Sequence, residues 1–533
     1  MILDANSDDI ENRGRFQVCI VGSGPAGMTI GLELSRAGYQ VVVLEGGGLE
    51  YDDASQNMYE GTSVGRSLPL GLRDSRMRFL GGSSNCWAGG CGTLDPIDLE
   101  SRPWVLHSGW PIERKDIDPY YARAEKYLDI QDFFFEKNDL LQNANEQLSF
   151  DAAKLDVKYL LFNETGRMTF GYHYRKEIDE SKTLTIITHC NVAKFMEDSV
   201  SDRVDNVLFR NTNGKIFTLK ADLFVLACGG IENPRVLLNS RDKNAGGVGN
   251  GKDLVGRFFM DHVISTIATV MPLAASEKLD FLTWGESNTV PLPFSPYIAY
   301  LTLGPDIQQK ERCLNSGLFL STQEAPFSPG LRAAIFLKNA LRDGNFDRIR
   351  AEYFTDILSN LGEVTAGFYE WIRNRRLPKS RIAVKFQAEQ APNPNSRVTL
   401  AEKKDIFGMN MAQLDWRFSE IDRTSLNVPL RVLSQEFGRL GLARVKLDNW
   451  VAENATEYPE TLDFRGGFHH TGTTRMGSTP STGVVDRDCR VFEVRNLFVA
   501  GSSVFPTNGW VNPTFTIVAL AIRVSDTLAK ELK

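Results

Sequence analysis

The sequence predicts an α/β protein of two domains, and three observations support this prediction. The chain has 533 residues, more than a single hydrophobic core normally serves. Residues 16–45 have the pattern of a strand, a glycine-rich turn, a helix and a second strand. Residues 496–529 have the pattern of a strand, a small-residue turn and a helix. Apolar strands that alternate with helices are typical of doubly wound sheets.

The composition is ordinary for a globular protein and argues against some classes of function. Hydrophobic residues make up 42% of the chain and charged residues 24%, both within the usual range. The net charge of −7 gives no electrostatic reason to expect a nucleic-acid partner. Seven cysteines without tight spacing do not form a disulfide framework, which favours a reducing compartment. We predict no metal site.

The N-terminal region gives no sign of export. Residues 1–16 are polar and acidic, without the basic and then apolar stretches of a signal peptide. No stretch reaches the roughly 18 consecutive apolar residues of a membrane-spanning helix. The expectation is therefore a cytoplasmic protein.

The first element carries a dinucleotide-binding pattern. Gly22, Gly24 and Gly27 form a G-x-G-x-x-G sequence directly after the apolar run 16–21. Gly22 permits a tight turn, Gly24 lets the backbone approach a pyrophosphate, and Gly27 lets the helix pack closely on the strand. Glu45, at the end of the second strand, is placed to accept hydrogen bonds from ribose hydroxyls. The alternative is a glycine-rich turn in an unrelated sheet, and the pattern does not separate FAD from NAD.

The C-terminal unit favours FAD. A strand-like run at 496–500 leads into a turn at Gly501, and a helical stretch covers 515–528. Pro513 suits the first position of that helix, and Asn512 suits the cap before it. A helix N-terminus facing the site would stabilise the negative charge that a reduced flavin carries around N1. Asn512 is therefore either a simple helix cap or a residue of the site.

Two neighbouring histidines precede this unit. His469 and His470 lie in a turn rich in Gly and Thr, and they are two of the six histidines in the chain. A histidine with an ordinary pKa near 6.5 can act as a base at neutral pH. We therefore expect one of them to be catalytic.

Together these motifs resemble the glucose–methanol–choline (GMC) oxidoreductase superfamily, in a bacterial branch near pyranose oxidase. The resemblance covers nearly the whole chain and comprises six motifs in the family's order. These are Gly22/Gly24/Gly27/Glu45, the segment 81–87 (GGSSNCW), the segment 226–234 (LACGGIENP), Val255-Gly256-Arg257 with Met260-Asp261-His262, the segment 469–477 (HxxGTxRMG) and the segment 509–514 (GWVNPT).

The resemblance implies an FAD-binding domain that is interleaved with a substrate domain built on an antiparallel sheet. The implied FAD-binding segments are 1–105, 181–262 and 465–533, and the implied substrate segments are 106–180 and 263–464. The implied reaction is oxidation of the CH–OH group of an alcohol, by hydride transfer to flavin N5.

Site residues follow from the same resemblance. His469 is the implied base and Asn512 the second catalytic residue, with His470 a neighbour. Val192 resembles the residue whose backbone meets the adenine. The implied cofactor-binding residues are Gly22, Gly24, Gly27, Glu45, Gly82, Ser83, Asn85, Cys86, Val192, Gly501, Ser502, Asn512, Pro513 and Thr514.

Cys86 departs from the family pattern. Pyranose and choline oxidases carry at this position a histidine that is covalently bonded to the flavin. Cysteine removes the histidyl link, and we expect non-covalent FAD with Cys86 as a small apolar neighbour of the flavin. The alternative is an S-cysteinyl bond, because a thiolate is a good nucleophile.

The substrate side is less clearly marked. Residues 381–387 alternate like a half-buried strand, and the run 397–400 resumes the sheet after a turn. Glu389 or Gln390 reaches the pocket, unless both are surface side chains. Trp510 either stacks on a sugar ring or belongs to the core. The family branch and Trp510 are the grounds for predicting a sugar, glycoside or polyol substrate.

The insert 327–378 reads as amphipathic helices among basic residues. Internal packing with a solvated face explains the pattern, and a docking surface for a membrane or a partner subunit is the alternative.

Two further functions stay open at this point: an FAD-containing non-redox lyase of the same superfamily, and a flavin-stabilised interaction protein. The electron acceptor, oxygen or another molecule, is undetermined.

Overall fold

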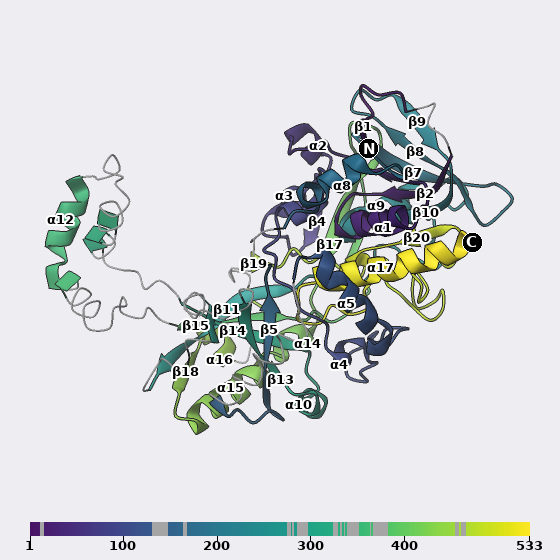
Figure 1. The fold of residues 1–533 in the computed structure, drawn as a ribbon. Helices are drawn as coiled ribbons and strands as arrows, with labels where there is room; N and C mark the ends of the chain where they lie inside the picture. The colour runs from purple at the N-terminus through teal and green to yellow at the C-terminus, as the bar shows by residue number, and fades with distance from the viewer. Residues whose placement is uncertain are drawn as a thin grey trace.

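A computed structural model gives the fold of the chain. It describes residues 1–10, 15–130, 148–163, 168–273, 297–322, 382–453 and 465–533, with shorter stretches within 279–284, 329–365 and 458–459. In Figure 1 both termini lie beside a parallel sheet, and an antiparallel sheet forms the second part of the molecule.

The parallel sheet has six strands and contains the predicted strands 16–21 and 41–44, both confirmed without a shift. Every neighbouring pair in it is parallel. The run expected at 496–500 is a strand one residue shorter at each end. The order is β1 (Ile2–Asp4), β6 (Leu184–Thr188), β3 (Val41–Leu44), β2 (Phe16–Val21), β10 (Ala221–Leu226) and β20 (Leu497–Val499).

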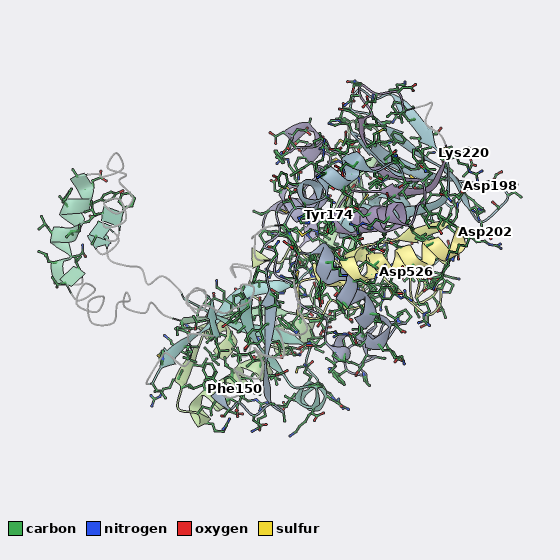
Figure 2. The ribbon with its side chains drawn as sticks, in the orientation of Figure 1. Phe150, Tyr174, Asp198, Asp202, Lys220 and Asp526 are labelled. Carbon is green, nitrogen blue, oxygen red and sulfur yellow. The ribbon has the colours of Figure 1, made fainter. Side chains whose placement is uncertain are left out.

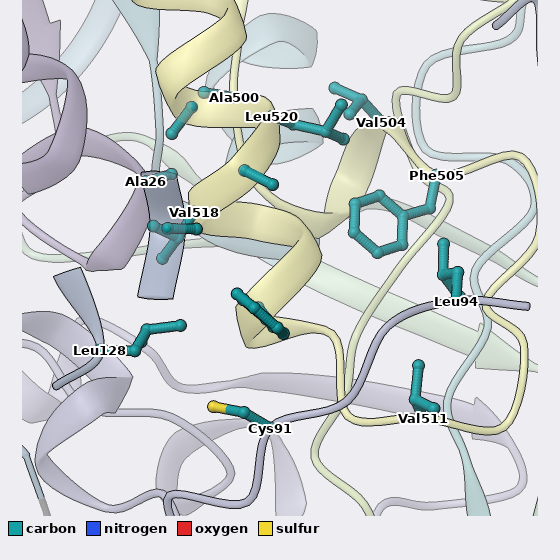
Figure 3. Packing of buried hydrophobic residues seen from close by; sticks show 14 of the residues in the cluster. Ala26, Cys91, Leu94, Leu128, Ala500, Val504, Phe505, Val511, Val518 and Leu520 are labelled. Carbon is teal, nitrogen blue, oxygen red and sulfur yellow. The ribbon is translucent and has the colours of Figure 1, made fainter. Parts of the chain in front are cut away.

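Two helices cover one face of this sheet. Helix α1 (Pro25–Arg36) packs against β2, β3 and β6, and α17 (Thr514–Glu531) packs against α1. A Cβ added at Gly31 of α1 would lie 3.3 Å from side chains of both Val43 and Leu184, so the small residue lets helix and sheet approach closely. Figure 3 shows the apolar side chains that α17 buries, among them Val518 and Leu520.

A three-stranded antiparallel sheet packs against the other face of the parallel sheet. It consists of β7 (Asn191–Glu197), β8 (Val204–Arg210) and β9 (Ile216–Leu219). Phe195 of β7 contacts Phe224 of β10, with ring centroids 6.0 Å apart. Val225 follows Phe224 in β10 and is paired in register with Ile20 of β2, whose side chain faces α1. Since side chains alternate along a strand, Phe224 points away from α1.

The antiparallel sheet has eight strands and includes one parallel pair, β12 (Thr283–Trp284) with β14. Its main path is β18 (Ala443–Leu447), β11 (Val263–Pro272), β15 (Ile382–Ala388), β14 (Ser316–Thr322), β13 (Tyr297–Leu303) and β5 (Leu155–Leu161), with β19 (Arg465–Gly466) beside β11. Strand β15 lies one residue further along the chain than the predicted range 381–387. Only Lys385 along it is partly exposed, so the strand is not half-buried as expected. Helix α15 (Asn427–Arg439) lies against β18 and β5, and its Phe437 stacks on Phe150, which Figure 2 labels.

One expectation about the substrate sheet is wrong. The run 397–400 does not resume the antiparallel sheet, because β16 (Arg397–Lys404) belongs to a separate sheet with β17 (Asn410–Trp416) and β4 (Gly61–Gly65). The turn at 392–396 redirects the chain toward β4, which comes from the N-terminal third of the sequence.

The interleaving of segments is visible at helix α5 (Asp118–Tyr127). It lies within the segment 106–180, yet it packs against α17. Arg123 of α5 forms ion pairs with Glu33 of α1 and with Asp526 of α17, and Figure 2 labels Asp526 on that helix. The domain boundaries given above remain predictions.

Most of the insert 327–378 lies outside the described residues. Within it, α12 (Ala351–Ser359) is helical and lies apart from the two large sheets in Figure 1. Its Phe354 and Leu358 are exposed. Among the residues that the structure describes, no helix combines the length and apolar character needed to cross a bilayer.

Candidate active site

A cavity of about 500 Å³ opens between the parallel and antiparallel sheets. This volume lies within the range of roughly 300–1,000 Å³ that small-molecule and cofactor sites occupy. Its lining brings together the glycine turn after β2, the segment 75–89, the histidine turn, the start of α17 and residues of the antiparallel sheet.

Each of the three glycines in the dinucleotide-binding turn is glycine for a different structural reason. Gly22 has φ +101°, and a Cβ there would lie 2.7 Å from the Ala227 carbonyl oxygen. A Cβ at Gly27 would lie 1.9 Å from the Gly22 carbonyl oxygen, so Gly27 permits the close packing of turn and helix. A Cβ at Gly24 would meet nothing within 4 Å, and Gly24 lines the cavity. Only Gly24 therefore leaves room for a ligand rather than for the protein itself.

Charged side chains surround this end of the cavity. The Glu45 carboxylate accepts hydrogen bonds from the backbone N–H and hydroxyl of Ser23 and from the N–H of Gly47. Arg76 and Arg78 also line the cavity. Arg76 pairs with Glu232, while the buried Nε of Arg78 finds no hydrogen-bond partner among the described residues. The sequence motifs do not point to either arginine, although both lie within five residues of the start of the segment 81–87.

The segment 81–87 meets the glycine turn. A Cβ at Gly82 would lie 3.0 Å from the Gly24 Cα, and the Gly81 N–H donates to the Ser23 hydroxyl over 3.2 Å. Ser83 and Cys86 line the cavity, and the Cys86 thiol donates to the Ser83 carbonyl at 3.4 Å. Asn85 lies outside the lining and instead donates to the carbonyls of Leu80 and Gly82, which shapes the loop.

The C-terminal segments complete the lining. Val192, Gly501, Ser502, Asn512, Pro513 and Thr514 all line the cavity. Helix α17 begins at Thr514 with Pro513 before it, and the Asn512 side chain does not cap it. The Asn512 amide instead donates to the Gly90 carbonyl (2.8 Å) and accepts from Gln387 Nε2 (3.0 Å). The cap interpretation of Asn512 is therefore wrong.

His469 also lines the cavity and is held by its backbone as well as its ring. Its backbone N–H donates to Asp261 Oδ1 over 2.7 Å. Phe468, just before it, has φ +53°, a strained value for a residue with a side chain. Burial, followed by the neighbouring His262 and His470, holds the pKa of His469 well below its ordinary value. The ring is therefore neutral at neutral pH and can accept a proton.

His470 lies on the same cavity wall but in a different setting. Its ring packs against Phe259 with centroids 5.6 Å apart, and its carbonyl accepts from the Ser502 hydroxyl. Burial and nearby Arg76 lower the pKa of His470 to about 3. Its buried Nε2 has no hydrogen-bond partner among the described residues.

The three predicted substrate residues lie elsewhere. Trp510 is 1% exposed, packs against Tyr300 and donates its indole N–H to Asp95, so it belongs to the core and presents no ring to a sugar. Glu389 forms a buried ion pair with Arg102, and Gln390 donates to the Arg417 carbonyl. Both are buried, so the surface alternative is wrong as well.

The substrate side of the cavity is formed by the antiparallel sheet. Gln387 of β15 lies there and also donates to the Trp510 carbonyl over 2.6 Å. It is the last residue of the strand predicted at 381–387, and the alternation of side chains along that strand was the signal that could have found it. The rest of this wall is apolar or aromatic: Leu160, Phe162, Ile264, Ile298, Tyr300 and Phe319.

These residues fit FAD. A pyrophosphate suits the glycine turn for three reasons. There is open space at Gly24, Arg76 and Arg78 supply positive charge, and no described side chain caps the N-terminus of α1 at Gly24. The start of α17 suits a group that becomes negatively charged on reduction. The fold and the cavity together define a flavoprotein of the dinucleotide-binding class.

Comparison with known proteins gives a family resemblance. Residues 17–243 match the model described as FAD dependent oxidoreductase, and residues 392–521 match the model described as GMC oxidoreductase. The chain is therefore similar to FAD-dependent oxidoreductases over its N-terminal part and to GMC oxidoreductases over its C-terminal part, and its named relatives are oxidases and dehydrogenases.

Relatives extend over most of the chain. It is 23% identical to 2-methyl-1,2-propanediol dehydrogenase of Mycolicibacterium austroafricanum, over 96% of this chain and 95% of that protein. It is 39% identical to C-glycoside 3-oxidase of Arthrobacter globiformis, over 24% of this chain and 23% of that protein. A fungal aryl-alcohol oxidase has the same fold, with a TM-score of 0.59 and 15% identity over 98% of this chain and all of that one (100%).

Proposed function

We propose that the protein oxidises the CH–OH group of an alcohol to a carbonyl with bound FAD, and that His469 is the base. The observation that supports this most is the cavity itself. A neutral histidine, the amide of Asn512 and the dinucleotide-type glycine turn all line it.

The chemistry follows from the residues. FAD, when bound, supplies the acceptor for the hydride that leaves the carbinol carbon. The bare ring nitrogen of His469 accepts the hydroxyl proton, so the alcohol loses one hydride and one proton. Asn512 cannot act as a base. Its Oδ1 accepts from Gln387, and its Nδ2, which donates to Gly90, carries a second hydrogen that can bind the substrate oxygen.

Two substrate classes have support. The names of the two enzyme relatives given above point to a diol and a C-glycoside, which agrees with a polyol or glycoside substrate. The apolar wall of the antiparallel sheet favours an alcohol with an apolar body, such as an aryl or branched alkyl alcohol, bound through few polar contacts.

An anaerobic screen decides between them. The enzyme is mixed with polyols, glycosides, aryl alcohols and alkyl alcohols, and the flavin absorbance near ~450 nm is followed. Bleaching by one class identifies the substrate class. Purified protein that binds FAD and is bleached by no alcohol, yet cleaves a hydroxylated compound, would instead support the lyase alternative.

Cys86 gives a prediction about the attachment of FAD. We expect non-covalent FAD, because the thiol donates to the Ser83 carbonyl and no histidine stands at this position. Acid precipitation of the wild-type protein should leave the flavin in the supernatant. Flavin that stays with the pellet in the wild type, and is released in Cys86→Ala, would establish the S-cysteinyl bond. Cys91→Ala, a buried cysteine five positions along the chain, is the matched control.

A further inference from the structure

A second histidine, His262, stands directly behind His469. The Nδ1 atoms of the two rings are 2.7 Å apart, which is hydrogen-bond distance. The rings meet edge to face, with centroids 5.0 Å apart and an interplanar angle of 84°. His262 is fully buried and follows Asp261 at the end of the FAD-type segment, before β11.

The position of the proton on His262 is set by its other nitrogen. His262 Nε2 lies 2.8 Å from the carbonyl oxygen of Gly509. A carbonyl oxygen can only accept, so Nε2 must carry the hydrogen. Burial lowers the pKa of His262 to about 4, so the ring is neutral at neutral pH. A neutral imidazole carries one hydrogen, and therefore His262 Nδ1 is a bare acceptor.

The position of the proton on the His469 ring follows from that of His262. A hydrogen must lie between the two Nδ1 atoms, and His262 Nδ1 has none, so His469 Nδ1 carries it. His469 Nε2 is then unprotonated and is the nitrogen that accepts a proton from the substrate. We propose that His262 is a positioning residue that fixes this tautomer and orientation of His469, through the chain of contacts from Gly509 to His262 to His469. The inference rests on the proposed role of His469 as base.

The surrounding residues hold both rings in this arrangement. Asp261 Oδ1 accepts the backbone N–H groups of His262 and of His469, each over 2.7 Å. A Cβ at Gly467 would lie 2.7 Å from His469 Nδ1 and 3.1 Å from the His262 Cβ, so the glycine leaves the room that the pair needs.

His262 does for His469 what the aspartate does in a Ser-His-Asp triad, but without a charge. It holds the correct tautomer and accepts a hydrogen bond from the imidazolium once His469 has taken the proton. The proton stays on His469. Two acidic side chains act on the pair: Asp261, whose pKa burial raises to about 7, and Glu389, which is paired with Arg102.

Nitrogen NMR of the ¹⁵N-histidine-labelled holoenzyme tests the tautomer directly, because protonated and bare ring nitrogens have different shifts. His469→Gln identifies the signals of His469 by their loss. In the wild type, His469 should show a protonated Nδ1 and a bare Nε2. The opposite tautomer in the wild type would overturn the proposal, and this measurement needs no variant at position 262.

Variants at position 262 test the consequence. His262→Phe keeps the ring volume and removes the acceptor, so His469 should become a mixture of tautomers. Flavin reduction should then slow by about 10²-fold, which is the lower end of the rate loss expected when a general base is removed. The dissociation constant of the substrate should change little. His262→Asn keeps an acceptor near the Nδ1 position and should recover most of the rate. His173→Phe, the same change at an exposed histidine, should change neither measurement.

Two results would overturn the inference: an unchanged His469 tautomer in a FAD-bound His262→Phe, or no recovery by His262→Asn when both variants retain FAD. Failure of the proposed function is separate. It would appear as undiminished flavin reduction in His469→Ala, whatever the tautomer of the wild-type ring.

Discussion

Replacing His469 with alanine should lower the rate of flavin reduction by substrate about 10²- to 10⁴-fold, the range expected for loss of a general base. The protein should keep its fold and its FAD, because the contact of His469 that shapes the loop is made by its backbone N–H to Asp261. The measurement is anaerobic stopped-flow reduction of the bound flavin. Substrate binding should survive, so the loss should appear in the limiting rate rather than in the dissociation constant.

His470→Ala is the matched control. Its ring packs on Phe259, and the contact with Ser502 comes from its backbone carbonyl, so we expect a much smaller loss of rate. A greater loss in His470→Ala than in His469→Ala, with FAD retained in both, would place the base on the other histidine.

Replacing Gly24 with valine should produce folded protein that is nearly free of FAD. The backbone at Gly24 has φ −66°, which any residue adopts, and an added Cβ meets no protein atom within 4 Å. The side chain therefore costs the fold little and occupies cavity space. Overpacking of about 1–3 kcal/mol would weaken FAD binding roughly 5- to 150-fold. Flavin content per protein and the thermal midpoint of the apoprotein measure the two effects.

Gly438→Val is the control for Gly24→Val. Gly438 lies exposed in α15, and a Cβ there also meets nothing within 4 Å. It should retain full flavin content. Full occupancy in Gly24→Val would show that the glycine turn is not the place where the pyrophosphate binds.

The prediction of the fold was most accurate where the signal is local. The strands 16–21 and 41–44 were predicted to the residue, because an apolar run bounded by glycine defines a buried parallel strand over a few positions. The run 397–400 was placed in the wrong sheet, because its pairing with β17, and through it with β4, joins distant segments.

In the candidate site, the cofactor residues were predicted better than the substrate residues. Of the predicted cofactor residues, all but Gly27 and Asn85 line the cavity, and those two shape the turns beside it. The three predicted substrate residues do not line the cavity, because all three lie in loops whose packing depends on distant segments: Glu389 pairs with Arg102, and Trp510 packs on Tyr300. Trp510 points into the core, while Gln387 reaches the cavity.

Local patterns of amino acids predicted the dinucleotide turn, the terminal helix and the histidine turn, because each is a short pattern whose physical reason lies within about thirty residues. Which side chains meet depended instead on how distant elements pack in the folded chain. His262 contacts His469 across 207 positions of sequence, and Gln387 contacts Asn512 across 125. Such contacts depend on how separate sheets pack, and no local propensity specifies that packing. The tautomer of the proposed base is therefore a property of the fold and not of any one motif.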